Sequence, residues 1–184
     1  LSFHNLLQIF TTFLAAGNHT TVSAISWGAL ILAENPQLMK SLQNSENLNK
    51  ALTRFSEEVL RIIAPVPQLP RVALKDFEVG GVTVPKGATV WLCFSSGNRD
   101  DQKFPAADKF QLDRNIAIQH LSFGVGIHRC IGAMLDRMEM RCAFREIVTR
   151  MDNLTTLSGQ ASTVGTLDSY GLGALPVSFA KRPV

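Results

Sequence analysis

Cys130 is the residue of this chain whose setting most clearly suggests chemistry. It lies in the stretch SFGVGIHRCIGAML, residues 122–135, between two glycines and the expected first turn of a helix. Glycine has no Cβ, so the backbone at Gly124 and Gly126 can turn tightly and approach something large and flat. The unpaired amides and the positive dipole end of a helix N-terminus favour a thiolate over a thiol.

A thiolate in this position can act as a nucleophile, a redox sensor or a metal ligand. A nucleophile needs a paired base and oxyanion donors, and no esterase-like or protease-like motif accompanies Cys130. A single-thiolate iron ligand needs only a glycine-rich turn, amide donors to the sulfur and a dry pocket. His128 and Arg129 add cationic or donor groups beside the sulfur, and Gly132 keeps its far side uncrowded. The pattern therefore favours metal ligation.

The elements that must position Cys130 follow from the hydrophobic pattern. Helical periodicity predicts three helical regions, at 1–33, at 37–63 (one or two helices) and at 133–151. Residues 77–92 alternate around the hairpin signal Gly80-Gly81, and GALPVSFA at 173–180 reads as a further strand. This order predicts a mainly α protein with small β-sheets at its edge, in the α+β class.

The first helical region has an unusual composition. Residues 1–33 contain no Asp, Glu, Lys or Arg, yet polar side chains recur too often for contact with lipid, so a membrane span is not favoured. A helix that is uncharged all round belongs in the middle of a globular protein, covered on every side. Because 184 residues would struggle to cover it, we expect that a partner half is missing.

Charge and cysteine usage exclude several classes of protein. The net charge of +3 carries no long run of like charges, so nucleic-acid binding is not favoured. Three cysteines give neither a disulfide framework nor a zinc-binding pair, which fits a reducing, cytoplasmic compartment. We interpret Cys93 and Cys142 as buried, inert residues in a strand and a helix.

The loop around Cys130 resembles the haem-binding loop of the cytochrome P450 superfamily, soluble bacterial type, in the motif Phe123-Gly124-x-Gly126-x-His128-x-Cys130-x-Gly132. The resemblance implies that the Cys130 thiolate is the axial ligand of haem b, pushing electron density toward bound oxygen. It also implies that His128 hydrogen-bonds a haem propionate and that Phe123 packs near the proximal face. The implied fold is the C-terminal portion of the P450 fold, from the long central helix onward. Residues 1–184 would then form part of one haem-thiolate monooxygenase domain whose N-terminal half is absent.

Two further elements of the family occur in the same order. Glu58 and Arg61 resemble its ExxR pair, whose spacing puts both charges on one helix face, and the pair would support the Cys130 loop. In many relatives an arginine near FPAADKF completes this structural lock, and Lys109 stands at the position that we align with it. Arg71 matches an arginine that pairs with a haem propionate.

The central helix carries AAGNHTT, residues 15–21, where the family typically has small residues, an acid and an alcohol. The resemblance implies that Ala16 and Gly17 leave space over the iron and that Thr20 relays protons to bound oxygen. Thr20 could also hydrogen-bond back to the Ala16 carbonyl. His19 replaces the acid, and it could either shuttle protons near neutral pH or point away into the core.

The family resemblance also implies partners. Four arginines near Cys130 would receive an acidic ferredoxin or flavodoxin, namely Arg129, Arg137, Arg141 and Arg145. The other partners are dioxygen and a small hydrophobic substrate, with candidate contacts at Ala16, Val66 to Leu69 and Leu172.

The first hypothesis for the function is a bacterial haem-thiolate monooxygenase that inserts one oxygen atom into a hydrophobic substrate. His19 motivates a second, a haem-thiolate peroxygenase or nitric oxide reductase. A third is an incomplete, non-catalytic haem-binding fragment.

Overall fold

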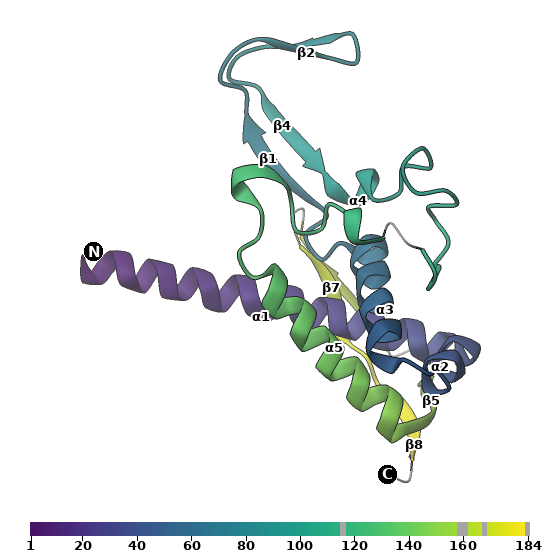
Figure 1. Cartoon of the computed structure of the whole chain (residues 1–184). Coiled ribbons are helices and arrows are strands. Elements are labelled where there is room, and N and C mark those ends of the chain that lie inside the picture. The colour runs from purple at the N-terminus through teal and green to yellow at the C-terminus, as the bar shows by residue number, and fades with distance from the viewer. Residues whose placement is uncertain (115–116, 158–161, 167–168, 183–184) are drawn as a thin grey trace.

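The computed structural model describes residues 1–114, 117–157, 162–166 and 169–182. Its long helices are α1 (Phe3–Glu34), α2 (Pro36–Gln43), α3 (Leu48–Ile63) and α5 (Ala133–Arg150). Between α3 and α5 the chain forms short helical turns, which are α4 (Phe94–Gly97), η1 (Ala117–Gln119) and η2 (Gly126–His128). The predicted α+β class, mainly helical with small sheets, is confirmed (Figure 1).

The strands pair only as antiparallel two-stranded sheets within the described residues. The first two sheets lie before α5, with β1 (Gln68–Val72) against β4 (Thr89–Cys93) and β2 (Phe77–Val79) against β3 (Val82–Val84). The other two follow α5, with β5 (Met151–Thr156) against β8 (Val177–Lys181) and β6 (Ser162–Gly165) against β7 (Tyr170–Ala174).

The predicted hairpin at Gly80-Gly81 is confirmed, because Val79 pairs with Val82 and both glycines have positive φ, 56° and 77°. The predicted strand at 173–180 is wrong in one respect. It is two strands, β7 and β8, that part at Leu175 and Pro176, since proline has no N–H for a ladder hydrogen bond.

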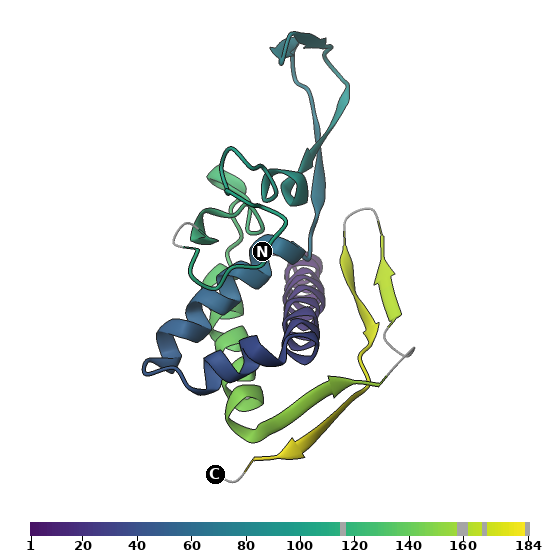
Figure 2. The same ribbon diagram turned by 90° about the vertical axis from the view of Figure 1, so that its right-hand side faces the viewer.

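The core forms where the second half of α1 meets α3 and α5. Figure 2 shows α1 nearly end-on, with α3 and α5 on one side and the β6–β7 hairpin on the other. Gly28 of α1 marks a close approach of the two helices, because a Cβ there would overlap the ring of the buried Phe144 of α5. The core is mostly aliphatic and aromatic, and its fully buried members include Ala24, Leu32, Leu42, Leu52, Phe55, Val59, Met140 and Phe144.

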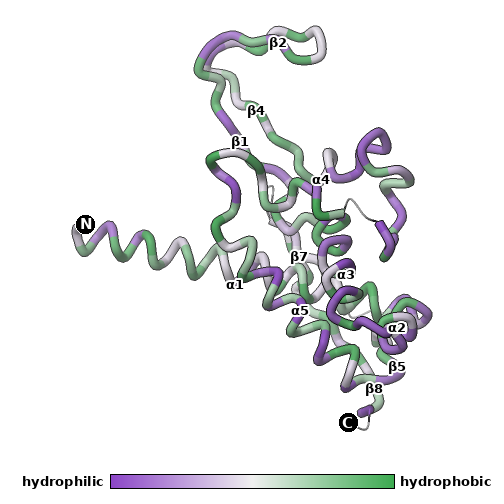
Figure 3. Tube along the Cα trace, in the orientation of Figure 1, coloured by the Kyte–Doolittle hydropathy of each residue, from purple (hydrophilic) through white to green (hydrophobic). Residues whose placement is uncertain are grey.

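The first half of α1 extends away from this core. Residues 1–19 are exposed, in agreement with the expectation that 184 residues do not suffice to cover this uncharged helix. Apolar residues recur along the extension (Figure 3), and the side chain of Phe3 is 81% exposed. Among the described residues, the helices do not combine the length and the apolar character that a membrane crossing needs.

Candidate functional site

Two glycines shape the loop that carries Cys130. Gly124 and Gly126 have φ values of 65° and 71°, a left-handed conformation that other residues adopt at a cost. The reversal lets the Cys130 amide donate to the Phe123 carbonyl at 2.8 Å and the Gly124 amide donate to the Leu121 carbonyl at 2.8 Å. The loop thus closes on itself and presents Cys130 as an exposed free thiol.

Helix α5 begins three residues after Cys130. Its N-cap residue is Gly132, which makes no side-chain capping bond, and a Cβ at Gly132 would lie 3.7 Å from the Cys130 Sγ. The absence of that Cβ leaves this side of the sulfur open. The first amides of a helix lack carbonyl partners within it, so this end of α5 offers donors and a positive dipole to a nearby anion.

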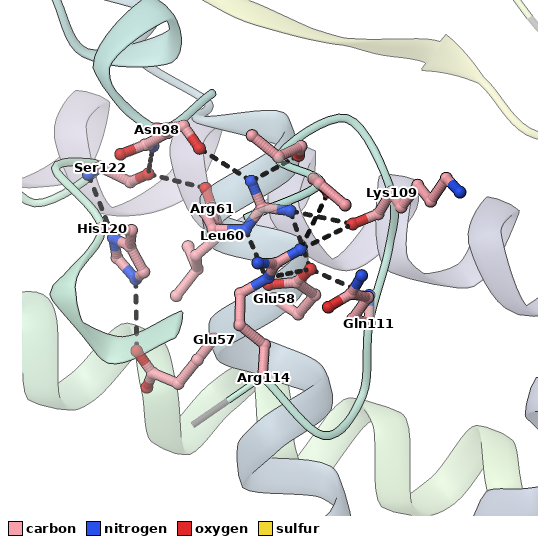
Figure 4. Close-up of polar contacts among 12 residues, drawn as sticks. Glu57, Glu58, Leu60, Arg61, Asn98, Lys109, Gln111, Arg114, His120 and Ser122 are labelled. Carbon is pink, nitrogen blue, oxygen red and sulfur yellow. Dashed lines mark hydrogen bonds and ion pairs between the residues drawn. The ribbon is translucent and has the colours of Figure 1, made fainter. Parts of the chain in front are cut away.

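A polar network ties the Cys130 loop to α3 through Asn98, just after α4 (Figure 4). The Asn98 side chain accepts from the Leu121 amide at 2.6 Å and donates to the Ser122 hydroxyl at 2.9 Å. Ser122 in turn donates to the Leu60 carbonyl at 2.7 Å. Asn98 is fully buried, so these bonds are shielded from water and fix the start of the loop.

A second set of contacts links α3, the loop and α5 through Glu57. Its carboxylate accepts two hydrogen bonds from Arg137, at 2.6 and 2.9 Å. The Ser122 amide donates to Nδ1 of His120 at 3.1 Å, and the other ring nitrogen, Nε2, lies 3.2 Å from Glu57 Oε2. Burial raises the pKa of Glu57, but the hydrogen bonds from His120 and Arg137 outweigh it and bring this pKa to about 2.

Arg137 also touches the motif directly, because its guanidinium stands 4.5 Å from the centre of the Phe123 ring. The residue is only 8% exposed. The expectation that Arg137 belongs to an exposed basic stripe is therefore wrong, since its charge is neutralised inside the protein by Glu57. Arg129 is exposed, and Arg141 and Arg145 are partly exposed.

The ExxR pair is confirmed as a buried bidentate ion pair. Both nitrogens of Arg61 that face Glu58 lie 2.8 Å from its carboxylate, and both residues are fully buried. Arg61 also donates to the carbonyls of Asn98 and Ala107. The pair therefore holds both α4 and the following loop against α3 (Figure 4).

The third member of this cluster is Arg114, not Lys109. Arg114 Nε lies 3.2 Å from Glu58 Oε1, and its other nitrogens donate to the carbonyls of Pro105, Ala106 and Lys109. Lys109 supplies only its backbone carbonyl, which also accepts from Arg61, and its side chain is exposed. The lysine therefore removes no ion pair from the cluster. The arginine that completes it lies five residues after the position that we aligned.

The two expected propionate partners lie at the surface. His128 ends η2 and is exposed. Arg71 is exposed on β1 and donates to the Pro70 carbonyl at 2.8 Å. The described contacts do not join these two side chains to one another, so their expected role stays a prediction.

On α1, Thr20 donates to the Ala16 carbonyl at 2.7 Å, as predicted. Gly17 has open space where a Cβ would stand, with no atom within 4 Å. The next residue, Thr21, donates to Asp136 of α5 at 2.7 Å. This bond sets α1 against the helix that follows Cys130, and so brings AAGNHTT and the Cys130 loop to neighbouring parts of the fold.

His19 faces another direction from Thr21. It lines an open hollow of about 650 Å³ between α1 and the β6–β7 hairpin, together with Asn18, Gly171 and Leu172. Its Cε1 would stand 3.9 Å from a Cβ built on Gly171. Of the expected substrate contacts Leu172 lines this hollow, whereas Ala16 and Val66 to Leu69 do not.

Cys93 and Cys142 are both exposed, so the expectation that they are buried is wrong. Cys142 lies on the face of α5 that turns away from Phe144, and Cys93 is the last residue of β4, a mostly exposed strand of a two-stranded sheet. Sequence reasoning also missed Glu57, Asn98, Arg114, His120 and Ser122. The signals that could have found them are the doubled glutamate at 57–58 and the polar residues that flank the glycine loop.

Comparison with known proteins identifies a family for most of the chain. A family model described as Cytochrome P450 matches residues 1–161. The chain is 37% identical over 150 residues to cytochrome P450 109 of Bacillus spizizenii, which covers 81% of this chain and 36% of that protein. It is 37% identical over 141 residues to linalool 8-monooxygenase of Pseudomonas putida, covering 77% of this chain and 34% of that protein.

Solved structures agree with the sequence relatives. Cytochrome P450 CYP109Q5 from Chondromyces apiculatus matches with a TM-score of 0.91 and 29% identity, over 99% of this chain and 46% of that one. CYP150A6 of Mycobacterium marinum matches with a TM-score of 0.88 and 28% identity, over 94% and 44%. The chain therefore spans less than half the length of these relatives, and its helices and small sheets form part of their fold.

Proposed function

Because this chain belongs to the cytochrome P450 family, we propose that it supplies the C-terminal, haem-ligating part of a single haem-thiolate monooxygenase domain. The observation that carries the proposal is the Cys130 loop, whose shape is set by two left-handed glycines and by buried contacts to α3. A ligand loop needs such support, because the sulfur must be held in place before the metal binds.

The residues present fit haem b. Cys130 would bind the haem iron through sulfur, the open side at Gly132 leaves room for a flat ring, and His128 and Arg71 would hold the propionates. Gly17 leaves room on α1 for a large group, and apolar side chains are exposed around the sulfur, at Val125, Ile127 and Ile131. When bound, the haem would supply the dioxygen chemistry, tuned by the thiolate.

The chain's own residues would organise the rest of the site. The Thr20 hydroxyl donates a hydrogen bond to the Ala16 carbonyl, and this bond fixes a proton-bearing group on α1. Ala16 and Gly17 keep the helix surface small beside it. The apolar surface of α1 would keep water away from a small hydrophobic substrate, and Leu172 would contact that substrate from β7.

An acidic electron donor of the ferredoxin or flavodoxin type would dock by charge near the cysteine. Arg137 is buried and paired with Glu57, so the expected docking residues that stay at least partly exposed are Arg129, Arg141 and Arg145. The unpaired cysteines are consistent with a reducing, cytoplasmic compartment.

A haem titration followed by absorbance tests the proposal. We expect Cys130→Ser to abolish the thiolate-type spectrum of the bound haem. Cys142→Ser is the matched control, because this cysteine is also exposed but lies within α5. If both variants bind haem with the spectrum of the unmodified chain, Cys130 is not the ligand.

His19 favours a second candidate function, a peroxygenase or nitric oxide reductase, because the position where the family has an acid carries no carboxylate. Turnover with hydrogen peroxide that matches donor-supported turnover would favour this candidate. Turnover that requires the electron donor would favour the monooxygenase. If the exposed part of α1 leaves the haem unprotected, the chain would instead be a haem-binding fragment without turnover.

A further inference from the structure

Asp136 is a carboxyl group that the haem site described above does not use. It lies in the first turn of α5, where its Oδ1 accepts the hydrogen bond from Thr21 of α1 at 2.7 Å. Its other oxygen, Oδ2, is buried and accepts no hydrogen bond from any of the described residues. A carboxylate normally fills such a position with a donor or a cation, because a buried, unpaired anion is strongly unfavourable.

The cation next to Asp136 is already engaged by other partners. Arg137 is the neighbouring residue, but its nitrogens are occupied by Glu57 of α3 and by the Ala133 carbonyl. The other charged groups that act on Asp136 are Glu57 and Glu139, which are both negative. Each of them disfavours a second negative charge at this point.

These contacts make the neutral carboxyl the better fit to the site. With a proton on Oδ2, the group has no net charge to bury and Oδ1 still accepts from Thr21. Burial is the main cause that raises the pKa of Asp136, and Glu139 and Glu57 add to it. The Thr21 hydrogen bond and Arg137 lower this pKa without cancelling the rise.

We propose that Asp136 is a positioning residue whose proton controls a tie between α1 and α5. While the carboxyl is neutral, the bond to Thr21 holds the two helices in the observed register. When the carboxyl loses its proton to water, the bond from Thr21 strengthens, but Oδ2 becomes part of a buried anion without a partner, so the contact between the two helices is destabilised and opens to water. Thr21 adjoins Thr20, so the same proton controls how Thr20 is held relative to the Cys130 loop, a consequence that rests on the proposed function.

The direct test is a ¹³C NMR titration of the aspartate carboxyls, with the urea-unfolded chain as reference. We expect the pKa of Asp136 to lie above its value in the unfolded chain. Thr21→Val should raise this pKa further, Thr21→Ser should leave it unchanged because the hydroxyl is kept, and Glu139→Gln should lower it. A pKa of Asp136 at or below the unfolded value, or one that none of these variants moves, would overturn the proposal.

A second measurement follows the tie itself. A raised folded pKa means that the stability from Asp136 is fully present below the unfolded pKa and is lost as pH rises through the folded pKa. As pH rises, the unfolding midpoint of the unmodified chain should therefore fall relative to the midpoint of Asp136→Asn. Parallel pH profiles would contradict the proposal. Neither measurement requires haem, so a failure here is separate from a failure of haem binding, which the Soret band reports on the same samples.

Discussion

At the scale of single residues, the site depends on charges that are buried and paired. Glu57 and Glu58 are adjacent in α3, but they bind different arginines and support different parts of the chain. Glu58 holds the loop after α4 through Arg61 and Arg114. Glu57 holds the Cys130 loop and α5 through His120 and Arg137. The two adjacent glutamates therefore anchor both the loop after α4 and the Cys130 loop with α5 at one turn of α3.

The lowered pKa of Glu57 predicts a specific loss of stability in acid. A depressed folded pKa contributes stability above the unfolded value of 4.5, and this contribution is lost as pH falls toward about 2. The full effect is about 3 kcal/mol, since one pKa unit corresponds to about 1.4 kcal/mol. Urea unfolding of the unmodified chain and of Glu57→Gln should show a stability difference that shrinks through this range. A difference that is constant with pH would contradict the assigned pairing.

The position of the third charged residue can be tested by a matched pair of variants. Arg114→Met leaves Glu58 paired with Arg61 but removes the donor to the carbonyls of Pro105 and Ala106, and should lower the free energy of unfolding by about 1–3 kcal/mol. Lys109→Met changes only an exposed side chain and should alter it by less than about 0.5 kcal/mol. Denaturant unfolding measures both. A larger loss of stability in Lys109→Met than in Arg114→Met would mean that Lys109, and not Arg114, is the partner of Glu58.

At the scale of elements, α1 and α5 are brought together by small and polar residues. Gly28 lets Phe144 approach the α1 backbone, Ser23 donates to the Tyr170 carbonyl of β7, and Thr21 bonds Asp136. Trp27 stacks on Tyr170 with ring centres 5.2 Å apart. The second half of α1 is thus fixed on both sides, whereas its first half is not.

Two glycines on α1 should respond oppositely to alanine. Gly28→Ala places a methyl group against Phe144 and should destabilise the fold by about 1–3 kcal/mol. Gly17→Ala meets no neighbour and should stabilise the helix by roughly 0.5–1 kcal/mol. Thermal unfolding of the two variants checks the contrast. Equal effects would mean that α1 does not pack on α5 as described.

The sequence predicts the parts of the fold and site that depend on local spacing. The helices, the Gly80-Gly81 hairpin and the Glu58–Arg61 pair are local, and the structure confirms them. The partners of Glu57 are 63 and 80 residues away, at His120 and Arg137, and Asn98 meets Ser122 across 24 residues. Such contacts depend on how the elements pack, so a charge at regular helical spacing, such as Arg137, was wrongly assigned to the surface.

At the scale of the whole molecule, a large apolar surface is exposed near the proposed haem site. It includes the first half of α1 and a stripe on the loop and the start of α5, formed by Ile127, Ile131, Met134, Leu135 and Met138. Exposed apolar side chains that gather along a helix and a loop in this way are typical of contact with another protein surface or a ligand.

This surface should cause the chain to associate. Phe10 and Phe13 on α1 are 61% and 58% exposed, so Phe10→Ser with Phe13→Ser should reduce self-association without changing the unfolding midpoint. Gln8→Ser, also on the exposed part of α1, is the control that should change neither property. Sedimentation velocity at matched concentrations measures the association. Unchanged association in the double variant would show that this part of α1 is not the associating surface.

The proposed function depends on coordination of haem iron by the Cys130 sulfur. The most direct test is the absorption spectrum of the reduced carbon monoxide complex, recorded on the haem-loaded protein and on Cys130→Ala. We expect a Soret band shifted to the red, as a thiolate ligand produces, and loss of this shift in the variant. A band typical of a nitrogen ligand in the unmodified protein, or the same red shift in Cys130→Ala, would contradict this coordination.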